Sequence, residues 1–573
     1  AGLLRNNATP KNALTVKCRG AGANPFGTGA RVWLFAGGKI QYQQLQPTRG
    51  FQSSSDHSLH FGLDSISTAD SLLVVWPNQH FQVLKQIPAK GTITVNQQDA
   101  GAVFDYDLQF PPAPPLLQNV TAQWSSPWRH RENSFVDYNR QYLIPHALST
   151  LGPKMAVADV NGDGLDDIYV CGAAGQCGQL LLQRGNGFVS GDSTAFNRYA
   201  AAEENDALFF DANGDGYPDL LVTMGGNERP NGDSLLADRL YLNDGRGRFT
   251  EATGFLPALL RNKSCIAAAD IDKDGDIDLF LGTLADATKY GIRQSSFLLL
   301  NDGKGRYSQA PDTVIQLDSI GMVHAASFAD MNSDGWPDLV VTGEWMPVKI
   351  YYNNNGRFTA SDIPGSAGLW QSLWISDANG DGKPDVFGGN WGLNSKLAAG
   401  KIPPLKLYVK DFDNNGSTEQ IMAYTLPDKK EYTFLAKDEL ERALPVLKKA
   451  YLQYSEVAGK DVQYMFYDLF THFKEERADM LASACFINQG DKTFKAEQLP
   501  AALQLSPVFA FTTGVNGDMI GAGNFFGVIP YEGRYDALLP AFFPISAPAG
   551  PIANNRQLPL AGVEIRDMKW IRT

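Results

Sequence analysis

One nine-residue pattern occurs six times in this 573-residue chain, as Asp-x-(Asp/Asn)-x-(Asp/Asn)-Gly-x-x-(Asp/Glu). The copies begin at Asp159, Asp211, Asp270, Asp330, Asp377 and Asp411. Each offers side-chain oxygens at positions 1, 3, 5 and 9 and a backbone carbonyl at position 7, while the glycine at position 6 permits a sharp turn. Calcium takes about six to eight oxygen ligands. The pattern therefore predicts about six bound Ca²⁺ ions.

The predicted calcium ligands are the residues at positions 1, 3, 5, 7 and 9 of each loop. They are Asp159, Asn161, Asp163, Leu165 and Asp167; Asp211, Asn213, Asp215, Tyr217 and Asp219; Asp270, Asp272, Asp274, Asp276 and Asp278; Asp330, Asn332, Asp334, Trp336 and Asp338; Asp377, Asn379, Asp381, Lys383 and Asp385; and Asp411, Asp413, Asn415, Ser417 and Glu419.

Short apolar runs follow the loops, among them IYVCG, LLVTMGG and LVVTGEW, and they are typical of strands buried on both faces. Most repeats continue into a second strand and a hairpin with an Asn-Gly or Asp-Gly turn, as in LYLNDGRGRF. The first aspartates of successive loops are 52, 59, 60, 47 and 34 residues apart. Periods of this size with several short strands each predict propeller blades rather than a helical solenoid.

These repeats resemble the FG-GAP or VCBS repeats of integrin-α-like β-propellers, in which each blade carries a calcium hairpin of this form. A seventh, degenerate copy is expected at residues 506–527, without calcium because it lacks the acidic loop. The tail VEIRDMKWI is expected to supply the strand that closes the ring against the first blade. The resemblance implies an all-β fold with a seven-bladed propeller over residues 119–573.

The first hundred residues resemble a second family, the small ASPIC/UnbV domain that accompanies FG-GAP propellers. The matching pieces are Gly29-Ala30-Arg31-Val32, Gly50-Phe51, His60-Phe61-Gly62-Leu63, Asp70-Ser71-Leu72 and Val75-Trp76-Pro77. Independently, VWLFA, LLVVW and TITVN read as strands separated by Gly, Ser, Asp and Pro clusters. We therefore expect a β-sandwich over residues 1–110 and a stiff Pro-rich linker, containing PPAPP, over 111–118.

The net charge of −13 argues against nucleic acid as a main partner, because phosphate contacts require clustered Lys and Arg. The six loops hold 21 of the 62 acidic residues, so calcium sites explain the acidity better than an acidic interaction surface does. Such loops suit the weak affinities of about 10⁻⁴–10⁻³ M at which extracellular modules bind calcium. We therefore expect an extracellular or cell-surface location.

The two ends of the chain and its cysteines bear on the same expectation. The chain does not begin with Met or a signal sequence, and the opening LLRNN resembles the end of another propeller blade. We therefore expect the C-terminal part of a longer exported protein. No apolar run suits a membrane-spanning helix. The spacing of Cys171 and Cys177 leaves a disulfide open, whereas Cys18, Cys265 and Cys485 read as buried small side chains.

Residues 436–482 interrupt the β pattern with leucines at helical spacing, and Pro445 and Gly459 divide the predicted helices. This segment is expected to be an insertion within or between the last blades. Its aromatic side chains either dock a partner or pack on the side of the propeller, and the second alternative is the more common outcome for an apolar helical stripe.

A ligand face is predicted from the segments that follow the post-calcium strands. Its residues are Asn227, Glu228, Arg229, Glu344, Trp345, Asn390, Trp391, Asn524 and Phe525. Tryptophans beside Asn, Glu and Arg suit a sugar or a peptide loop. The alternative is that these residues seal the central channel of the propeller. No catalytic motif of a hydrolase, kinase or metalloprotease is present in the sequence, so we expect a protein that is not an enzyme.

Together these features predict a calcium-stabilised binding or scaffold protein. Proteins that resemble this arrangement are frequent among exported proteins of Bacteroidota, which implies a protein partner at the cell envelope, as an accessory part of an outer-membrane nutrient-uptake assembly of the SusC/SusD kind. Two alternatives remain: a lectin-like propeller that binds glycans, and a polysaccharide lyase or hydrolase whose paired carboxylates meet on a propeller face.

Overall fold

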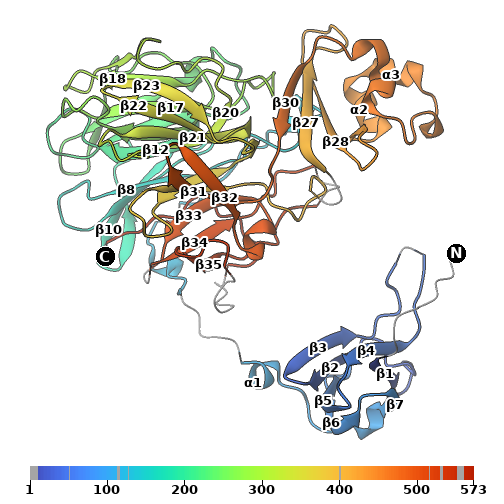
Figure 1. Ribbon diagram of the computed structural model, residues 1–573. Helices are drawn as coiled ribbons and strands as arrows, with labels where there is room; N and C mark the ends of the chain where they lie inside the picture. The colour runs from blue at the N-terminus through green and yellow to red at the C-terminus, as the bar shows by residue number, and fades with distance from the viewer. Residues whose placement is uncertain are drawn as a thin grey trace. The chain divides into compact units, whose positions relative to one another are not determined.

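The computed structural model describes residues 11–50, 52–111, 117–126, 128–398, 402–514, 517–529, 533–550 and 560–572 (Figure 1). The chain divides into two compact units, residues 1–114 and 115–573. The division falls within the predicted linker, whose residues 112–116 lie outside the described part, as do Phe51 and the opening LLRNN.

The smaller unit consists of two β-sheets that share one apolar core. The first sheet has the order β4-β1-β7, with β1 Asn12–Arg19, β4 Ser58–Asp64 and β7 Gly91–Asn96. The second has the order β3-β2-β5-β6, with β2 Arg31–Ala36, β3 Lys39–Gln44, β5 Thr68–Val75 and β6 Phe81–Pro88. Alternation places Leu14, Val16 and Cys18 of β1 in the core. A short helix, α1 Tyr106–Gln109, follows the second sheet.

The described part of the larger unit contains seven sheets, and six of them follow one another along the chain. The first has β8 Met155–Ala158, β9 Asp167–Val170, β10 Gln179–Arg184 and β11 Gly187–Ser190; the second β12 Glu203–Phe210, β13 Asp219–Gly225, β14 Arg239–Asn243 and β15 Phe249–Glu251; the third β16 Lys263–Ala269, β17 Asp278–Thr283, β18 Phe297–Asn301 and β19 Tyr307–Gln309.

The fourth sheet has β20 Met322–Ala329, β21 Asp338–Met346, β22 Lys349–Asn354, β23 Arg357–Asp362 and the short β24 Gly368–Leu369; the fifth β25 Ser372–Ser376, β26 Asp385–Gly389, β31 Ala484–Gly490 and β32 Thr493–Gln498; the sixth β33 Val508–Thr513, β34 Asp518–Gly523 and β35 Ala541–Pro544.

The first strands of successive sheets lie beside one another, from β8 to β12, β16, β20, β25 and β33, as in a propeller. The C-terminal tail joins the last sheet to the first, because Ile565 N donates to Gly523 O and Asp567 accepts from Met155 N. The tail makes this predicted connection without forming a strand in its described residues. Within the described residues the ring therefore has six blades rather than the seven that were predicted.

The missing blade is explained by the Asp411 loop, which lies outside the ring. It joins β27 Ile402–Lys410 to β28 Glu419–Thr425 in a separate sheet of order β29-β28-β27-β30, with β29 Glu431–Thr433 and β30 Lys474–Ala478. This sheet is inserted between β26 and β31, two paired strands of the fifth blade. The insertion therefore spans residues 390–483 rather than the predicted 436–482. The sequence analysis assigned its first two strands to the ring because their strand–loop–strand sequence has the same pattern as a blade.

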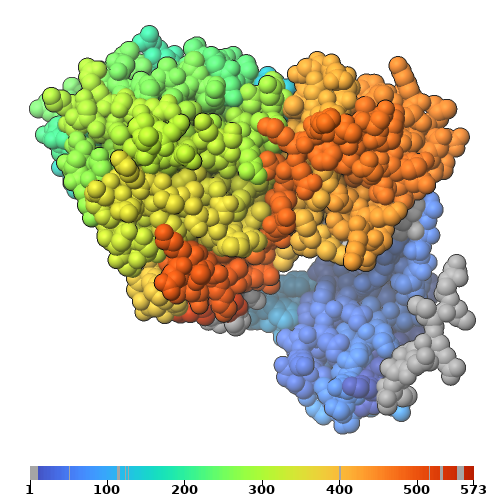
Figure 2. All heavy atoms as spheres, turned by 45° about the horizontal axis from the view of Figure 1, so that its top comes forward, coloured from blue at the N-terminus to red at the C-terminus, as the bar shows by residue number. Residues whose placement is uncertain are grey.

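The helices of the insertion are α2 Lys437–Ala443, α3 Pro445–Ala450 and α4 Val462–Phe466. Pro445 begins α3, as its position in the sequence predicted. Phe466 is buried in a core with Phe412 and Leu440, so part of the aromatic run packs within the insertion itself. Tyr464 and Tyr467 remain exposed. In the space-filling view the orange insertion stands beside the green and yellow blades (Figure 2).

None of the helices described is suited by length and apolar character to cross a bilayer. All five cysteines are free thiols, so the open question of a bridge between Cys171 and Cys177 is answered in the negative. The Sγ atom of Cys177 instead lies 2.9 Å from Asn197 Oδ1. Cys18, Cys265 and Cys485 are buried, as predicted.

Candidate calcium loops and the centre of the ring

The aspartate at position 1 organises each acidic loop by accepting hydrogen bonds from the loop backbone. In the second blade Asp211 Oδ1 accepts from Gly214 N at 2.8 Å and Asp215 N at 3.2 Å, and Oδ2 accepts from Gly216 N at 2.8 Å. Asp377 makes the same three contacts in the fifth blade. These bonds curl the chain around the carboxylate, so the loop conformation follows from the position-1 acid.

Two positions in each loop adopt the left-handed backbone conformation. Position 6 is always glycine, as the sequence pattern requires, with φ between +84° at Gly164 and +98° at Gly275. Position 4 is also left-handed, yet in three loops it is not glycine: φ is +62° at Lys273, +60° at Ser333 and +57° at Asn414. The sequence analysis missed this requirement, because lysine and serine do not signal positive φ.

The acid at position 9 connects the loop to its blade. Asp338 is fully buried; its Oδ2 accepts from Met331 N at 2.9 Å and its Oδ1 from Asn353 N on β22 at 2.7 Å. Asp167, Asp219, Asp278 and Asp385 make equivalent pairs of bonds. Burial raises the pKa of Asp338 to about 6 and that of Asp278 to about 7. A nearby cation would favour the ionised form of these acids.

The donor sets fit a hard cation. Carboxylate oxygens of Asp270, Asp272 and Asp274 lie within 4.8 Å of one another, and so do those of Asp411, Asp413 and Glu419. In the third-blade loop Asp270 Oδ1 is buried without a hydrogen-bond partner among the described residues. An uncompensated buried carboxylate oxygen is costly, and a bound ion would compensate it. In the four other loops asparagine supplies the oxygen at position 3.

An asparagine on the third strand of four blades connects each blade to the acidic loop of the preceding blade. Asn353 Nδ2 donates to Ile271 O, the position-2 carbonyl of the previous loop, at 2.8 Å. Asn243, Asn301 and Asn488 donate in the same way to Val160, Ala212 and Met331. We call these four side chains the blade latches. Their only sequence signal is an asparagine at the end of runs such as LYLN and IYYN.

Most of the predicted ligand face is buried. Asn227, Glu344, Trp345, Asn390, Trp391, Asn524 and Phe525 are each at most 3% exposed, and Glu228 is partly buried. Arg229 keeps an exposed side chain near Asp233. The insertion explains the burial, since Leu405, Leu407, Val409 and Met422 pack in one core with Trp345, Trp391 and Phe525. The prediction that these tryptophans form an exposed ligand face is therefore wrong. The residues instead close one end of the ring, which was the alternative.

A network of buried polar groups lies behind this apolar seal. Glu344 accepts from Tyr290 Oη at 2.6 Å and Gln371 Nε2 at 3.0 Å, and it lies 2.7 Å from His146 Nε2 and 3.0 Å from His324 Nε2. Burial opposes the charge of Glu344, but the two histidines hold its pKa well below its ordinary value. His146 has a raised pKa because its attraction to Glu344 outweighs burial. The resulting ion pair stays inside the ring.

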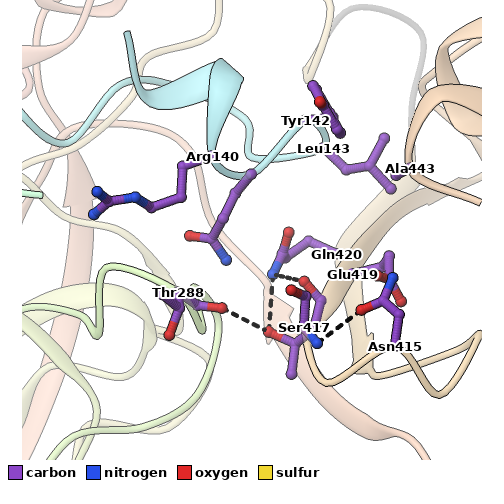
Figure 3. Close-up of a pocket in the computed structure, with 11 residues that line it drawn as sticks. Arg140, Tyr142, Leu143, Thr288, Asn415, Ser417, Glu419, Gln420 and Ala443 are labelled. Atoms are coloured by element: carbon purple, nitrogen blue, oxygen red, sulfur yellow. Dashed lines mark hydrogen bonds between the residues drawn. The ribbon is translucent and has the colours of Figure 1, made fainter. Parts of the chain in front are cut away.

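A cavity of about 130 Å³ lies where the Asp411 loop meets the ring (Figure 3). Its walls include Thr288 of the third blade, Glu419 and Gln420 of the insertion, and Gln141 from the segment that precedes the first blade. Gln141 is buried, and neither polar atom of its side chain has a partner in the described part of the chain. Thr418 Oγ1 lies 3.4 Å from Thr288 O. The sixth acidic loop therefore stands at the junction of insertion and ring.

Two family models match the sequence. Residues 20–102 match ASPIC and UnbV, and residues 159–222, 211–281 and 330–388 match the FG-GAP-like repeat. The chain carries an ASPIC/UnbV domain and FG-GAP-like repeats. The matched repeats contain the loops at Asp159, Asp211, Asp270, Asp330 and Asp377, so both resemblances expected from the sequence are confirmed. No curated protein matches the chain.

Two solved lectins are similar to this chain at a low level. A lectin of Agrocybe aegerita, described as recognising non-reducing terminal N-acetylglucosamine, is 15% identical over 73% of this chain and 91% of its own, with a TM-score of 0.30. The six-bladed fucose-binding lectin of Aleuria aurantia is 8% identical over 66% and 87%, with a TM-score of 0.28. Similarity at this level supports no inference about the ligand.

Proposed function

We propose that this protein is a calcium-stabilised extracellular binding or scaffold protein, and that it acts by binding rather than by catalysis. The observation that carries the proposal is the repetition of one acidic loop in five blades and in the insertion. In each loop the position-1 aspartate draws the backbone around a small space lined by oxygens, and the position-9 acid anchors that space to the blade. FG-GAP-like repeats fit such a role.

Calcium would act here by stabilising the turns between the first and second strands of the blades. Without the ion, three carboxylates in the Asp270 loop repel one another at close range. At about 1 mM calcium and a dissociation constant of about 100 μM, each occupied site adds about 1.4 kcal/mol to the free energy of unfolding. Several such sites would make the fold dependent on extracellular calcium concentrations.

Differential scanning calorimetry of the full chain tests this role. We expect the melting temperature to fall when calcium is removed with a chelator, to recover when calcium is restored, and to recover less with magnesium, which demands a stricter octahedral geometry. Isothermal titration should give about six calcium ions per chain. A melting temperature that is insensitive to chelator, together with no heat of calcium binding, would contradict the proposal.

The place of action that we propose is the outer surface of a cell envelope, as an accessory subunit of an outer-membrane assembly. Support for this location comes from the resemblance and from the calcium concentrations that the loops require. Affinity isolation of the native protein from detergent-solubilised envelopes in calcium tests it. Stoichiometric recovery of an outer-membrane transporter would support the proposal, whereas recovery of the protein alone would favour a free binding protein.

A further inference from the structure

The ring contains a polar cavity of about 300 Å³ at its centre. Inner strands of five blades line it, through residues such as Asp206 on β12, Trp374 on β25 and Phe511 on β33, and the tail contributes Asp567 and Trp570. A narrower space of about 30 Å³ extends from the same walls at Lys154 and Gln371 as far as His324. The cavity is thus the wide part of the central channel of the propeller.

The cavity and the seal formed by the insertion lie toward different ends of the inner strands. In the second blade Glu203 pairs with Gly225 at the start of β12, and Phe210 pairs with Asp219 beside the calcium loop. The cavity is lined by the middle of β20, at Ala325–Ala326, and by Ser372–Trp374 of the shorter β25. Trp374 lies two residues before Ser376, which pairs with Asp385 beside the acidic loop. Trp345 stands near the end of the second strand β21, and Trp391 follows the second strand β26, so both lie at the other end. The cavity accordingly faces the end that carries the calcium loops.

Two polar atoms of the cavity walls are buried without partners among the described residues. One is the donor Trp374 Nε1, and the other is the acceptor Gln371 Oε1. Gln371 is 5% exposed, and its Nε2 is already committed to Glu344 Oε1 and Leu369 O. Buried polar groups normally have hydrogen-bond partners, so these two atoms favour a ligand that both accepts and donates hydrogen bonds. A hydroxyl group does both.

The charged groups of the walls are already matched by protein partners. Lys154 Nζ donates to Ser264 O and lies 3.5 Å from Asp206 Oδ2, which also accepts from Ile266 N. Asp567 accepts from Met155 N and lies 3.6 Å from Lys569 Nζ. Arg566 Nη2 lies 2.6 Å from Glu564 Oε1. Each charged side chain among the described wall residues therefore has an oppositely charged partner. A neutral ligand rich in hydroxyl groups fits this balance best.

Aromatic rings complete the walls. Trp374, Phe509 and Phe511 come from two adjacent inner strands, and Trp570 stands in the tail with its side chain 51% exposed. Flat apolar rings beside a few hydrogen-bonding groups are typical of sites for small polar molecules, whose volumes begin at about 300 Å³. The indole of Trp570 is held by its Nε1 donating to Thr513 O at 2.6 Å. Its ring is thus fixed at the edge of the cavity.

We propose that the central cavity binds one neutral, hydroxylated sugar ring, such as the terminal unit of a glycan, with Trp374 Nε1 donating to one of its hydroxyls and Gln371 Oε1 accepting from one. Trp570 would lie over the ring at the open edge. This deepens the proposed binding function and rests on it, but it does not depend on whether the loops hold calcium. The tryptophans involved are different from those of the predicted ligand face.

Saturation-transfer NMR on the full chain tests the proposal with free methyl glycosides of glucose, galactose, mannose, fucose and N-acetylglucosamine, and with methyl glucuronide as the charged counterpart. We expect transfer to at least one neutral glycoside and a weaker signal for the glucuronide. Trp374→Phe keeps an aromatic ring but removes the donor, and it should weaken binding about fivefold. Trp570→Leu changes an exposed side chain and should weaken binding at least as much. Trp128→Phe, which lies against the first sheet outside the cavity, is the matched control.

Absence of transfer to all five neutral glycosides would overturn the proposal, as would binding that neither cavity variant changes. Stronger binding of the glucuronide would also overturn it. The calorimetric response to calcium should be the same in wild type, Trp374→Phe and Trp570→Leu. A protein that responds to calcium but binds no sugar refutes only the cavity site, whereas one that binds sugar without any response to chelator refutes only the calcium role.

Discussion

Replacement of the blade latch Asn353 by alanine should destabilise the ring and weaken calcium binding in the neighbouring blade. Asn353 lies at 1% exposure on β22, yet its side chain reaches the loop that starts at Asp270 in the preceding blade. Its side chain binds the carbonyl of Ile271, which directly follows Asp270, the first predicted calcium ligand of that loop. The substitution therefore acts on two blades at once, although it removes none of the predicted calcium ligands.

The expected loss in the free energy of unfolding follows from three hydrogen bonds that the Asn353 side chain makes. Asn353 Nδ2 donates to Ile271 O at 2.8 Å and to Pro337 O at 3.2 Å, and Oδ1 accepts from Gly356 N at 2.9 Å. At about 1 kcal/mol each, their loss costs about 3 kcal/mol in the free energy of unfolding. An unfolding entropy of about 2.1 cal/mol/K per residue gives about 1 kcal/mol/K for the larger unit, so its melting temperature should fall by about 3 °C.

Calorimetry in calcium measures this shift, with Asn354→Ala as the control because Asn354 is the exposed neighbour on the same strand. The calcium-dependent part is measured in the double variant with Asp274→Asn. Because Asn353 supports the loop that contains Asp274, the double variant should lose less stability than the sum of the losses in the two single variants. Equal melting temperatures for Asn353→Ala and Asn354→Ala would refute the latch, and strict additivity would refute its coupling to calcium.

Three further predictions concern the loops and the buried network. Asp274→Asn should reduce the calcium-dependent stabilisation by that of about one site, about 1.4 kcal/mol, and should raise stability slightly in chelator, with Asp312→Asn as an exposed control. Acidification from about pH 8 to about pH 5 should reduce the difference between the melting temperatures in calcium and in chelator. Burial raises the pKa values of Asp278 and Glu419 to about 7, so the ion-free fold gains stability as the pH falls through about 7. Over the same range protons compete with calcium for these carboxylates. A difference independent of pH would contradict this linkage. Glu344→Gln should lower the free energy of unfolding, measured in urea, by about 3–5 kcal/mol, because it leaves His146 buried without its anion. The control Glu475→Gln removes one side of an ion pair nearer the surface and should cost less than about 1 kcal/mol. Similar losses in the two variants would contradict the buried ion pair.

The sequence predicted the local units well, because each depends on residues that are close along the chain. The turn at each loop needs only the position-1 acid and the position-6 glycine, and both are visible in nine residues. The buried strands and the ASPIC/UnbV domain were equally readable. Blade number was not, because pairing of β26 with β31 joins Val386 to Phe486 across the whole insertion. A strand–loop–strand unit shows the same sequence pattern whether it belongs to the ring or to a sheet outside it.

The same long-range pairing explains why the predicted ligand face failed. The segments containing Trp345 and Trp391 do emerge together at one end of the ring, as the repeat pattern required, but the inserted sheet covers them. Burial by a segment distant in sequence leaves no trace in the local pattern. The buried network around Glu344 could not be foreseen for the same reason, since His146, His324 and Gln371 come from three separate parts of the chain.

The insertion also determines which end of the ring can receive a ligand. A bidentate contact joins Arg293 of the ring to Glu476 on β30, with both donor–acceptor distances at 2.8 Å, and the shared core around Trp391 excludes water from that end. Closing so long a connection between paired strands costs little more than closing a short one, because loop entropy grows only with the logarithm of length. The fold can therefore carry a capping domain at one end while its inner strands and tail shape an accessible cavity toward the other. The acidic loops lie at that second end, so calcium bound there, as we propose, would hold the strand turns around the cavity.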